Sequence, residues 1–326
     1  MFTLLWAPAT ILAAAFQVAR NALQRGLMPS TGPWGATLVR FLFGLPFSLL
    51  FAGVAFGLAP GVRFHWSVAF WVATVSGAVA QVLATAALLT AMKRAGFAVG
   101  TALQQSSLPL AAVIGLVVFR DPLGPVAWLG VAATTIGFAV LSWPGRQASG
   151  PQPRSGALFG LLSGLCFGFS LNAFRHAVLT LAPGHPAVSS LATVAVAQAL
   201  QTVGLLIWLG LRDPGALRAV TKSWRQSLGA GLFGALASSG WFFALALSPA
   251  APVRALGMIE VPIAALAGRR LFRERLHAKQ VLGGATILAG VVMTIFKFTP
   301  LAPPPERQLS HPSGIITLRC ISALKG

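Results

Sequence analysis

Residues 109–137, PLAAVIGLVVFRDPLGPVAWLGVAATTIG, recur without a gap as residues 262–290, PIAALAGRRLFRERLHAKQVLGGATILAG. At this offset of 153 the two stretches share 11 identities in 29 positions, and the identical residues include proline, glycine and arginine as well as apolar residues. Internal duplication of apolar segments is typical of membrane transporters. The repeat therefore predicts two related halves, with Ser107 of the first half opposite Glu260 of the second.

The composition is that of a chain that crosses a membrane many times. Of the 326 residues, 56% are hydrophobic and 9% are charged, with a mean hydropathy of +0.78. The net charge of +19 does not indicate nucleic-acid binding, because the 24 Lys and Arg residues are spread over the ends of apolar segments, where they anchor helices to headgroups. With only two cysteines, Cys166 and Cys320, we expect no disulfide framework, metal site or cofactor.

Apolar runs separated by turn formers or charges predict an all-α integral membrane fold with ten transmembrane helices, since about 20 apolar residues cross a bilayer. They are expected at 3–22, 35–58, 67–92, 97–119, 124–143, 156–181, 187–211, 227–248, 250–271 and 278–297. Five helices fall in each half, 1–143 and 156–297, and a linker at 144–155 joins the halves. An odd number of helices per half predicts two inverted five-helix repeats. The polar tail, 298–326, is predicted to be disordered.

The repeated stretch resembles EamA-type transporters of the drug/metabolite transporter superfamily. The resemblance rests on the proline-containing helix, the corner Phe119-Arg120-Asp121 with its copy Phe272-Arg273-Glu274, the Gly-rich helix that follows, and Arg40-Phe41-Leu42 in the second span. The first corner departs from the family pattern, because Asp121-Pro122 stands in place of Glu and another residue. The resemblance implies a multi-pass protein of the cell membrane and a secondary carrier, commonly an exporter of amino acids, other metabolites or drugs. The expected partners are a small-molecule substrate and the lipid bilayer, and a homodimer is left open.

Glu260 is the leading candidate for chemistry, because it is the only acidic residue deep inside an apolar segment. The other acidic residues lie at expected corners or in the tail: Asp121, Asp213, Glu274 and Glu306. A carboxylate within a membrane is costly and by default points to function. Two interpretations stay open: Glu260 couples transport to protons or recognises a cationic group, or it is held neutral by a hydrogen bond or by an arginine such as Arg40 or Arg175.

Polar side chains directly precede the proline of the fourth predicted span, in the order Gln104, Gln105, Ser106 and Ser107. Pro109 cannot donate to the Gln105 carbonyl, and Pro262 likewise leaves a carbonyl unpaired, so both helices are expected to bend. A bent helix beside polar side chains suits a substrate site near the bilayer midplane. The alternative is that these side chains only join helices.

Further polar residues of apolar segments form a second set of candidates: Gln17, Arg20, Asn21, Arg40, Asn172 and Trp241. Asn21 and Asn172 match across the repeat, which a shared packing role explains as well as ligand contact. Arg40 lies near a predicted helix end and is expected to reach the interface rather than bind an anion. Trp241 is either a packing residue or a wall that stacks against a cationic or aromatic ligand.

These patterns together predict a carrier that works by alternating access. The alternatives are a facilitator or exchanger without proton coupling and, less favoured, a scaffold or sensor that transports nothing. An intramembrane enzyme is not supported, because the sequence has no HExxH, no GxSxG and no second buried carboxylate. Basic residues gather in the odd-numbered connections, which predicts external termini. The family resemblance implies cytoplasmic termini instead.

Overall fold

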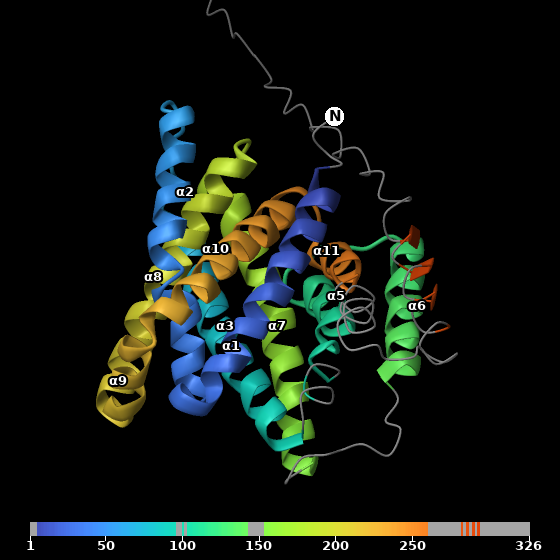
Figure 1. Cartoon of the computed structure of the whole chain (residues 1–326). Coiled ribbons are helices and arrows are strands. Elements are labelled where there is room, and N and C mark those ends of the chain that lie inside the picture. Colours follow the sequence, from blue (N-terminus) through green and yellow to red (C-terminus); the bar gives the residue numbers. More distant parts are fainter. Residues whose placement is uncertain are drawn as a thin grey trace, which may run out of the picture.

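A computed structural model describes residues 5–95, 100, 103–142 and 153–259, with residues 282, 285–286, 289–290 and 292–293. In this part of the chain the fold is helical and no strand occurs. The elements are α1 (Trp6–Leu42), α2 (Leu45–Leu58), α3 (Val68–Ala95), α5 (Ser107–Val117), α6 (Pro125–Ser142), α7 (Pro153–Leu181), α8 (Pro186–Arg212), α9 (Pro214–Lys222), α10 (Trp224–Leu247) and α11 (Ala250–Gly257) (Figure 1). The predicted tail, 298–326, lies outside the described residues.

Helix α1 consists of two helical segments that meet at Gly32. Gly32 has φ 66° and ψ 176°, outside the helical region, and Pro29 and Pro33 flank it. A positive φ is a conformation that glycine adopts without a steric penalty. Across this kink the Gln24 side chain donates a hydrogen bond of 2.7 Å to the Ala36 carbonyl. The sequence predicts a connection between spans 3–22 and 35–58. In the structure this stretch is helical except at Gly32.

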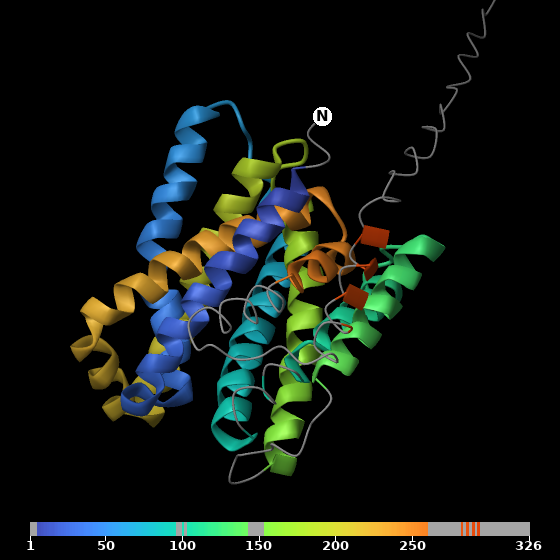
Figure 2. The same ribbon diagram turned by 45° about the vertical axis from the view of Figure 1, so that its right-hand side comes forward.

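Two antiparallel helix pairs form the centre of the molecule, α1 with α10 and α3 with α7 (Figures 1 and 2). Along α10, Gly240 faces Ala13 and Gly229 faces Leu23, so residue numbers rise in α1 as they fall in α10. In the second pair, Ser163 of α7 donates to the Ala84 carbonyl of α3 at 2.8 Å. Both pairs join the first half of the chain to the second.

Four glycines spaced four residues apart bring α7 close to its neighbours. A Cβ on Gly156, Gly160, Gly164 or Gly168 would meet Ala95, Leu103, Ser106 or Ala111, respectively, at 3.0 Å or less. Glycines at this spacing lie on one helix face and allow the backbones to approach, which is a usual basis of helix association in membranes. This face seats α5 and the end of α3 against α7.

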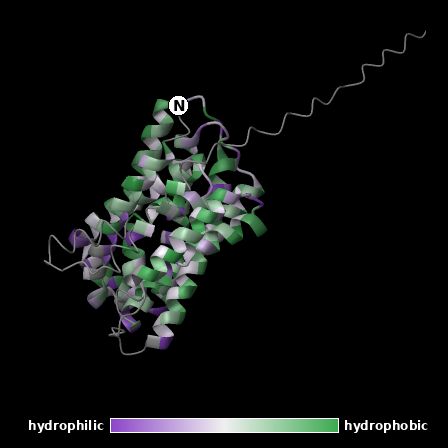
Figure 3. Cartoon of the chain, turned by 90° about the vertical axis from the view of Figure 1, so that its right-hand side faces the viewer, coloured by the Kyte–Doolittle hydropathy of each residue, from purple (hydrophilic) through white to green (hydrophobic). Residues whose placement is uncertain are grey.

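Among the described residues, five helical segments are long and apolar enough to cross a membrane: Gly26–Leu58, Val68–Ala95, Arg154–Leu181, Pro186–Arg212 and Trp224–Leu247. Shorter apolar helices occupy 107–117 and 125–140. Hydrophobic residues run along the length of the helices (Figure 3), and Leu58, Val68 and Leu211 are 82%, 80% and 79% exposed. The chain is thus a multi-pass membrane protein, and the described helices account for part of the ten predicted spans.

Several predicted boundaries were wrong. The connection after Arg212 contains a helix, α9, because Asp213 caps it by accepting from the Ala216 N–H at 2.9 Å and Pro214 occupies its first turn. Helix α7 begins at Pro153, inside the predicted linker. Arg20 and Arg254, which fall inside the spans predicted at 3–22 and 250–271, are buried within α1 and α11.

Candidate substrate site

Arg254 is the centre of a buried polar cluster between four helices. It lies on α11 and is 4% exposed. Its Nε donates to Ser107 Oγ at 3.0 Å, and its Nη2 donates to Gln105 Oε1. Both acceptors are buried and lie where α5 begins. The planar guanidinium of Arg254 has several N–H donors in fixed directions, so this one side chain of α11 can hold both Ser107 and Gln105 in place.

Trp241 of α10 forms the wall of this cluster. The Arg254 Cζ lies 6.0 Å from the Trp241 ring centroid, within the range of a cation–π contact. On the other side, Trp241 Nε1 donates to Gln17 Oε1 of α1 at 3.1 Å. Gly257 is so close that a Cβ there would lie 2.2 Å from the Trp241 ring. The indole is therefore held by its hydrogen bond to Gln17, its cation–π contact with Arg254 and its packing against the backbone of Gly257.

The helix that carries Gln105 is interrupted where the polar residues lie. Gln105 and Ser106 form a turn, and α5 begins at Ser107. The Gln105 carbonyl accepts from the Leu108 N–H at 3.1 Å, one residue earlier than in an α-helix, and Pro109 supplies no N–H. Gln104 is also buried, and its carbonyl faces Gly164 of α7. The polar side chains of this segment thus lie on an irregular backbone.

A second polar cluster surrounds Arg40 near the end of α1. Arg40 is 3% exposed, so the prediction that it reaches the interface was wrong. Its Nη1 donates to Thr85 Oγ1 at 3.4 Å, and Thr85 donates to the Gln81 carbonyl at 2.9 Å. Gln201 Nε2 of α8 then donates to Gln81 Oε1 at 2.8 Å. Polar contacts therefore run from α1 through α3 to α8.

Gln198 extends this cluster to α2, where its Oε1 accepts from Ser48 Oγ at 2.9 Å. Gly44 adjoins both parts: a Cβ there would lie 2.6 Å from the Arg40 carbonyl and 3.1 Å from Gln198 Oε1. Among the described residues, three buried polar atoms of this cluster lack a hydrogen-bond partner: Arg40 Nε, Gln198 Nε2 and Gln201 Oε1. Buried polar atoms ordinarily have partners, so this group calls for an explanation.

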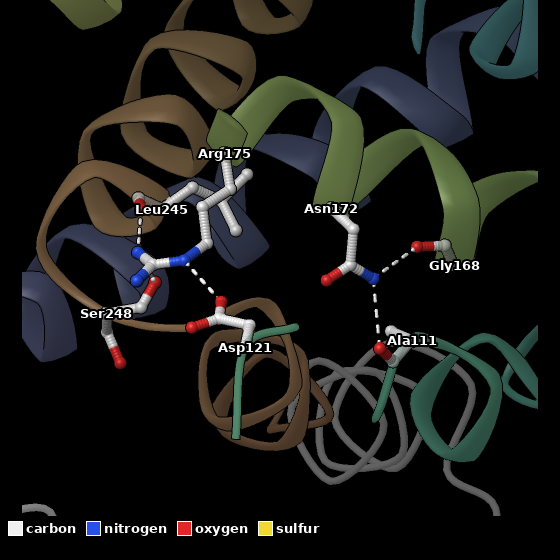
Figure 4. A network of polar contacts seen from close by, with 7 residues as sticks. All are labelled: Ala111, Asp121, Gly168, Asn172, Arg175, Leu245 and Ser248. Carbon is white, nitrogen blue, oxygen red and sulfur yellow. Dashed lines mark hydrogen bonds and ion pairs between the residues drawn. The ribbon is translucent and has the colours of Figure 1, made fainter. Parts of the chain in front are cut away.

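The two asparagines that match across the repeat make different contacts. Asn172 Nδ2 donates to the carbonyls of Ala111 and Gly168 at 2.9 Å each, which joins α7 to α5 (Figure 4). Asn21 Oδ1 accepts from Arg20 Nε and Nη2 at 3.2 and 2.7 Å. Asn172 has a packing role, whereas Asn21 orients a buried guanidinium.

Arg175 and Asp121 form an ion pair between α7 and the corner after α5, with Nε 2.7 Å from Oδ2 (Figure 4). Arg175 Nη1 also donates to the Leu245 and Ser248 carbonyls at 2.6 and 2.8 Å. The corner contains Arg120, whose φ is 53°. One guanidinium therefore joins the α5–α6 corner to the end of α10.

A pocket of about 650 Å³ lies to one side of these clusters, between α1, α3 and α7. Its walls are mainly apolar and include Trp34, Leu83 and Leu162, while Lys93 and Arg94 lie at the end of α3. It is lined by neither Arg40 nor Arg254. The described residues contain no group of three or more His, Cys, Asp and Glu that could hold a metal ion.

Of the predicted site residues, the structure brings Gln105, Ser107 and Trp241 together around Arg254. Glu260 and Pro262 lie outside the described residues. Sequence reasoning missed Arg254 because it lies near the start of the span predicted at 250–271, where basic residues are common anchors. The signal that could have found it is its isolation, since it is the only charged residue between Arg225 and Glu260.

Comparison with known proteins gives a family match for the second half of the chain. The model of the EamA-like transporter family matches residues 154–296, so this half is similar to that family of transporters and the expected resemblance is confirmed. A solved structure titled "Crystal structure of protein" is 19% identical and superposes with a TM-score of 0.61, covering 90% of this chain and 98% of its own. That likeness shows a shared fold. No curated protein matches the chain.

Proposed function

We propose that this membrane transporter is a secondary-active carrier that exports a small metabolite or drug-like solute across the cell membrane by alternating access. The observation that carries the proposal is the buried cluster of Arg254, Trp241, Gln105, Ser107 and Gln17, which draws on α1, α5, α10 and α11. Charged and polar side chains inside a membrane ordinarily mark a substrate or ion pathway.

The pattern of helix contacts supports two inverted halves. The principal pairs in the structure include α3–α7, α5–α7 and α3–α8, and also α10–α1, α11–α1 and α10–α2. The first three pairs become the second three when each helix of the first half is exchanged with its counterpart in the second half. The counterparts are α1 and α7, α2 and α8, α3 and α10, and α5 and α11. The pairs α2–α8 and α11–α5 map onto themselves. A two-fold relation between the halves accounts for this exchange, as in carriers built from inverted repeats.

The turns that interrupt the two helices at the site, α5 and α11, occur at positions that correspond in the sequence repeat. The turn at Gln105 and Ser106 precedes α5, and a turn at Met258 and Ile259 follows α11. Residues 105 and 106 correspond to 258 and 259 at the offset of 153. Helices that are broken near the membrane midplane line the substrate sites of many carriers, because their freed backbone groups need polar partners.

The test is transport by purified protein in liposomes with a panel of amino acids, other metabolites and small drugs. For any transported solute, Arg254→Gln is expected to lower the initial rate roughly tenfold or more, because Ser107 and Gln105 lose a charged donor. Trp241→Phe keeps the ring and removes the hydrogen bond to Gln17, so we expect a smaller loss. Arg63→Gln, at an exposed arginine, is the matched control.

Binding of panel compounds without flux would contradict a carrier and favour a scaffold or sensor. The role of Glu260 in proton coupling stays a prediction. If it is correct, Glu260→Gln abolishes the dependence of flux on a pH gradient. Flux that needs no pH gradient but is lost on this substitution would instead favour a facilitator or exchanger.

A further inference from the structure

The described interior of this protein carries an excess of positive charge. Arg20, Arg40 and Arg254 are 4%, 3% and 4% exposed, and all three lie on helices of the central bundle. The two described aspartates have other roles, since Asp121 binds Arg175 and Asp213 caps α9. The sequence has five acidic residues in all. Glu274 and Glu306 belong to a corner and a tail that the sequence predicts. Even if Glu260 is charged, the three buried guanidinium groups outnumber that one carboxylate.

Arg20 and Arg40 lie close enough to each other to repel electrostatically. Gly234 of α10 is beside both: a Cβ there would lie 3.4 Å from Arg40 Cγ and 3.5 Å from Arg20 Cδ. Holding two like charges together in a low-dielectric interior is costly. A bound anion at this position would remove much of that cost.

Arg40 has a donor that no described residue uses. Arg254 directs Nε and Nη2 to Ser107 and Gln105, and Arg20 directs the same two atoms to Asn21. Arg40 donates only a long bond of 3.4 Å, from Nη1 to Thr85, and its buried Nε has no partner among the described residues. A guanidinium binds a carboxylate or phosphate through just such adjacent N–H groups.

The neighbours of Arg40 suit the rest of a polar solute. In the described part of the chain, Gln198 Nε2 is a buried donor without a partner, and Gln201 Oε1 is a buried acceptor without one. The described part of this cluster contains no carboxylate, because the described acids are Asp121 and Asp213. The environment thus offers hydrogen bonds and positive charge to a ligand, and repels a cation.

From this arrangement we infer that the transported solute is an organic anion, and that Arg40 binds its carboxylate or phosphate group with the amide of Gln198 nearby. The inference rests on the proposed transport function. An anionic solute contrasts with the expectation that Glu260 recognises a cationic group. The reason for the contrast is that the described interior presents guanidinium groups.

The experiment measures currents on a solid-supported membrane carrying proteoliposomes of the full-length protein. The anion panel is benzoate, succinate, L-glutamate and glycerol 3-phosphate, and the cation panel is choline, tetramethylammonium and L-lysine. We expect currents with at least one anion and with no cation. Arg40→Gln is expected to lower the anion current roughly 10- to 100-fold, as loss of a charge-assisted hydrogen bond predicts.

Two further variants separate binding from folding. Arg40→Lys keeps the charge but not the paired donors, so the current is expected to fall less than with Arg40→Gln. Arg63→Gln, at an exposed arginine, is expected to leave it unchanged. The currents of all variants are compared per mole of monodisperse protein. If Arg40→Lys and Arg40→Gln lose equal thermal stability but carry unequal currents, the result supports a binding role for Arg40.

Currents with cations and none with anions would overturn the inference and leave transport intact. Anion currents that survive Arg40→Gln would also overturn it. Absence of current with both panels, together with absence of flux in the wider panel used for the proposed function, would contradict both.

Discussion

At the scale of single residues, Gly257 packs closely against Trp241 at the candidate site. A Cβ at Gly257 would overlap the indole ring at 2.2 Å. Gly257→Ala is therefore expected to displace Trp241 from Arg254 and to lower stability by about 1–3 kcal/mol, the usual cost of overpacking. The variant should also lower the transport rate. Thermal unfolding of the purified protein and flux in liposomes would measure the two effects.

Gly204 of α8 supplies the matched control, since a Cβ there meets nothing within 4 Å. Gly204→Ala should be neutral, or stabilising by up to about 1 kcal/mol through helix propensity. If both alanine variants behaved alike, the contact with Trp241 would not be the reason for glycine at 257.

Single polar residues were predictable where a local signal existed. Gln105 and Ser107 precede a proline in an apolar segment, and this pattern alone predicted a break in the helix beside polar side chains. Arg40 was misjudged, because its short distance from a predicted helix end suggested the interface, whereas α3 and α10 close over it. Burial by distant helices has no signature in the local sequence.

At the scale of helices, Arg175 holds three elements through one side chain. It contacts Asp121 after α5 and two carbonyls at the end of α10. Arg175→Lys is expected to lose about 1–2 kcal/mol of stability, because one ammonium group cannot reproduce this geometry. The expected loss is modest because the Arg175 and Asp121 side chains are 15% and 25% exposed and water screens the pair.

A double-mutant cycle with Asp121→Asn tests this interaction. The double variant should lose less stability than the sum of the two single variants, with a coupling of about 0.5–3 kcal/mol by denaturation. Additive losses would mean that the ion pair contributes nothing and that Arg175 acts through the carbonyls alone.

Helix positions were largely predictable, whereas their interruptions were less so. The spans expected at 67–92, 187–211 and 227–248 correspond to α3, α8 and α10. Apolar length alone indicated them. Helix α9 was missed, although Asp213-Pro214 is a helix-start signal, because a basic and polar segment between spans also suits a loop.

At the scale of the whole molecule, basic residues are unequally divided between the ends of the helices. Lys93 and Arg94 end α3, and Arg212, Lys222 and Arg225 surround α9. We expect these ends to face the cytoplasm by the positive-inside rule. Alkaline phosphatase fused after Lys297 should then be active outside, whereas green fluorescent protein fused after Gln147 should fluoresce inside.

Arg20 and Arg254 are buried within helices, so they do not contribute to this unequal division of basic residues. A phosphatase that is inactive after Lys297, with fluorescence at that position, would support the orientation that the family resemblance implies. The repeat in the sequence predicts two related halves, but it does not predict which helices of one half pack on the other. Packing of this kind depends on side-chain shape across the interface.

The pairing of α1 with α10 has a consequence for how the chain is made. Helix α1 ends at Leu42 and α10 begins at Trp224, so at about 5–20 residues per second the ribosome needs roughly 10–40 s to supply the partner. During that interval Arg20 and Arg40 lie on a helix that α10 does not yet cover. The insertion machinery must shelter two arginines that the finished protein hides, and a delay in translation between these helices should send more of the chain to degradation.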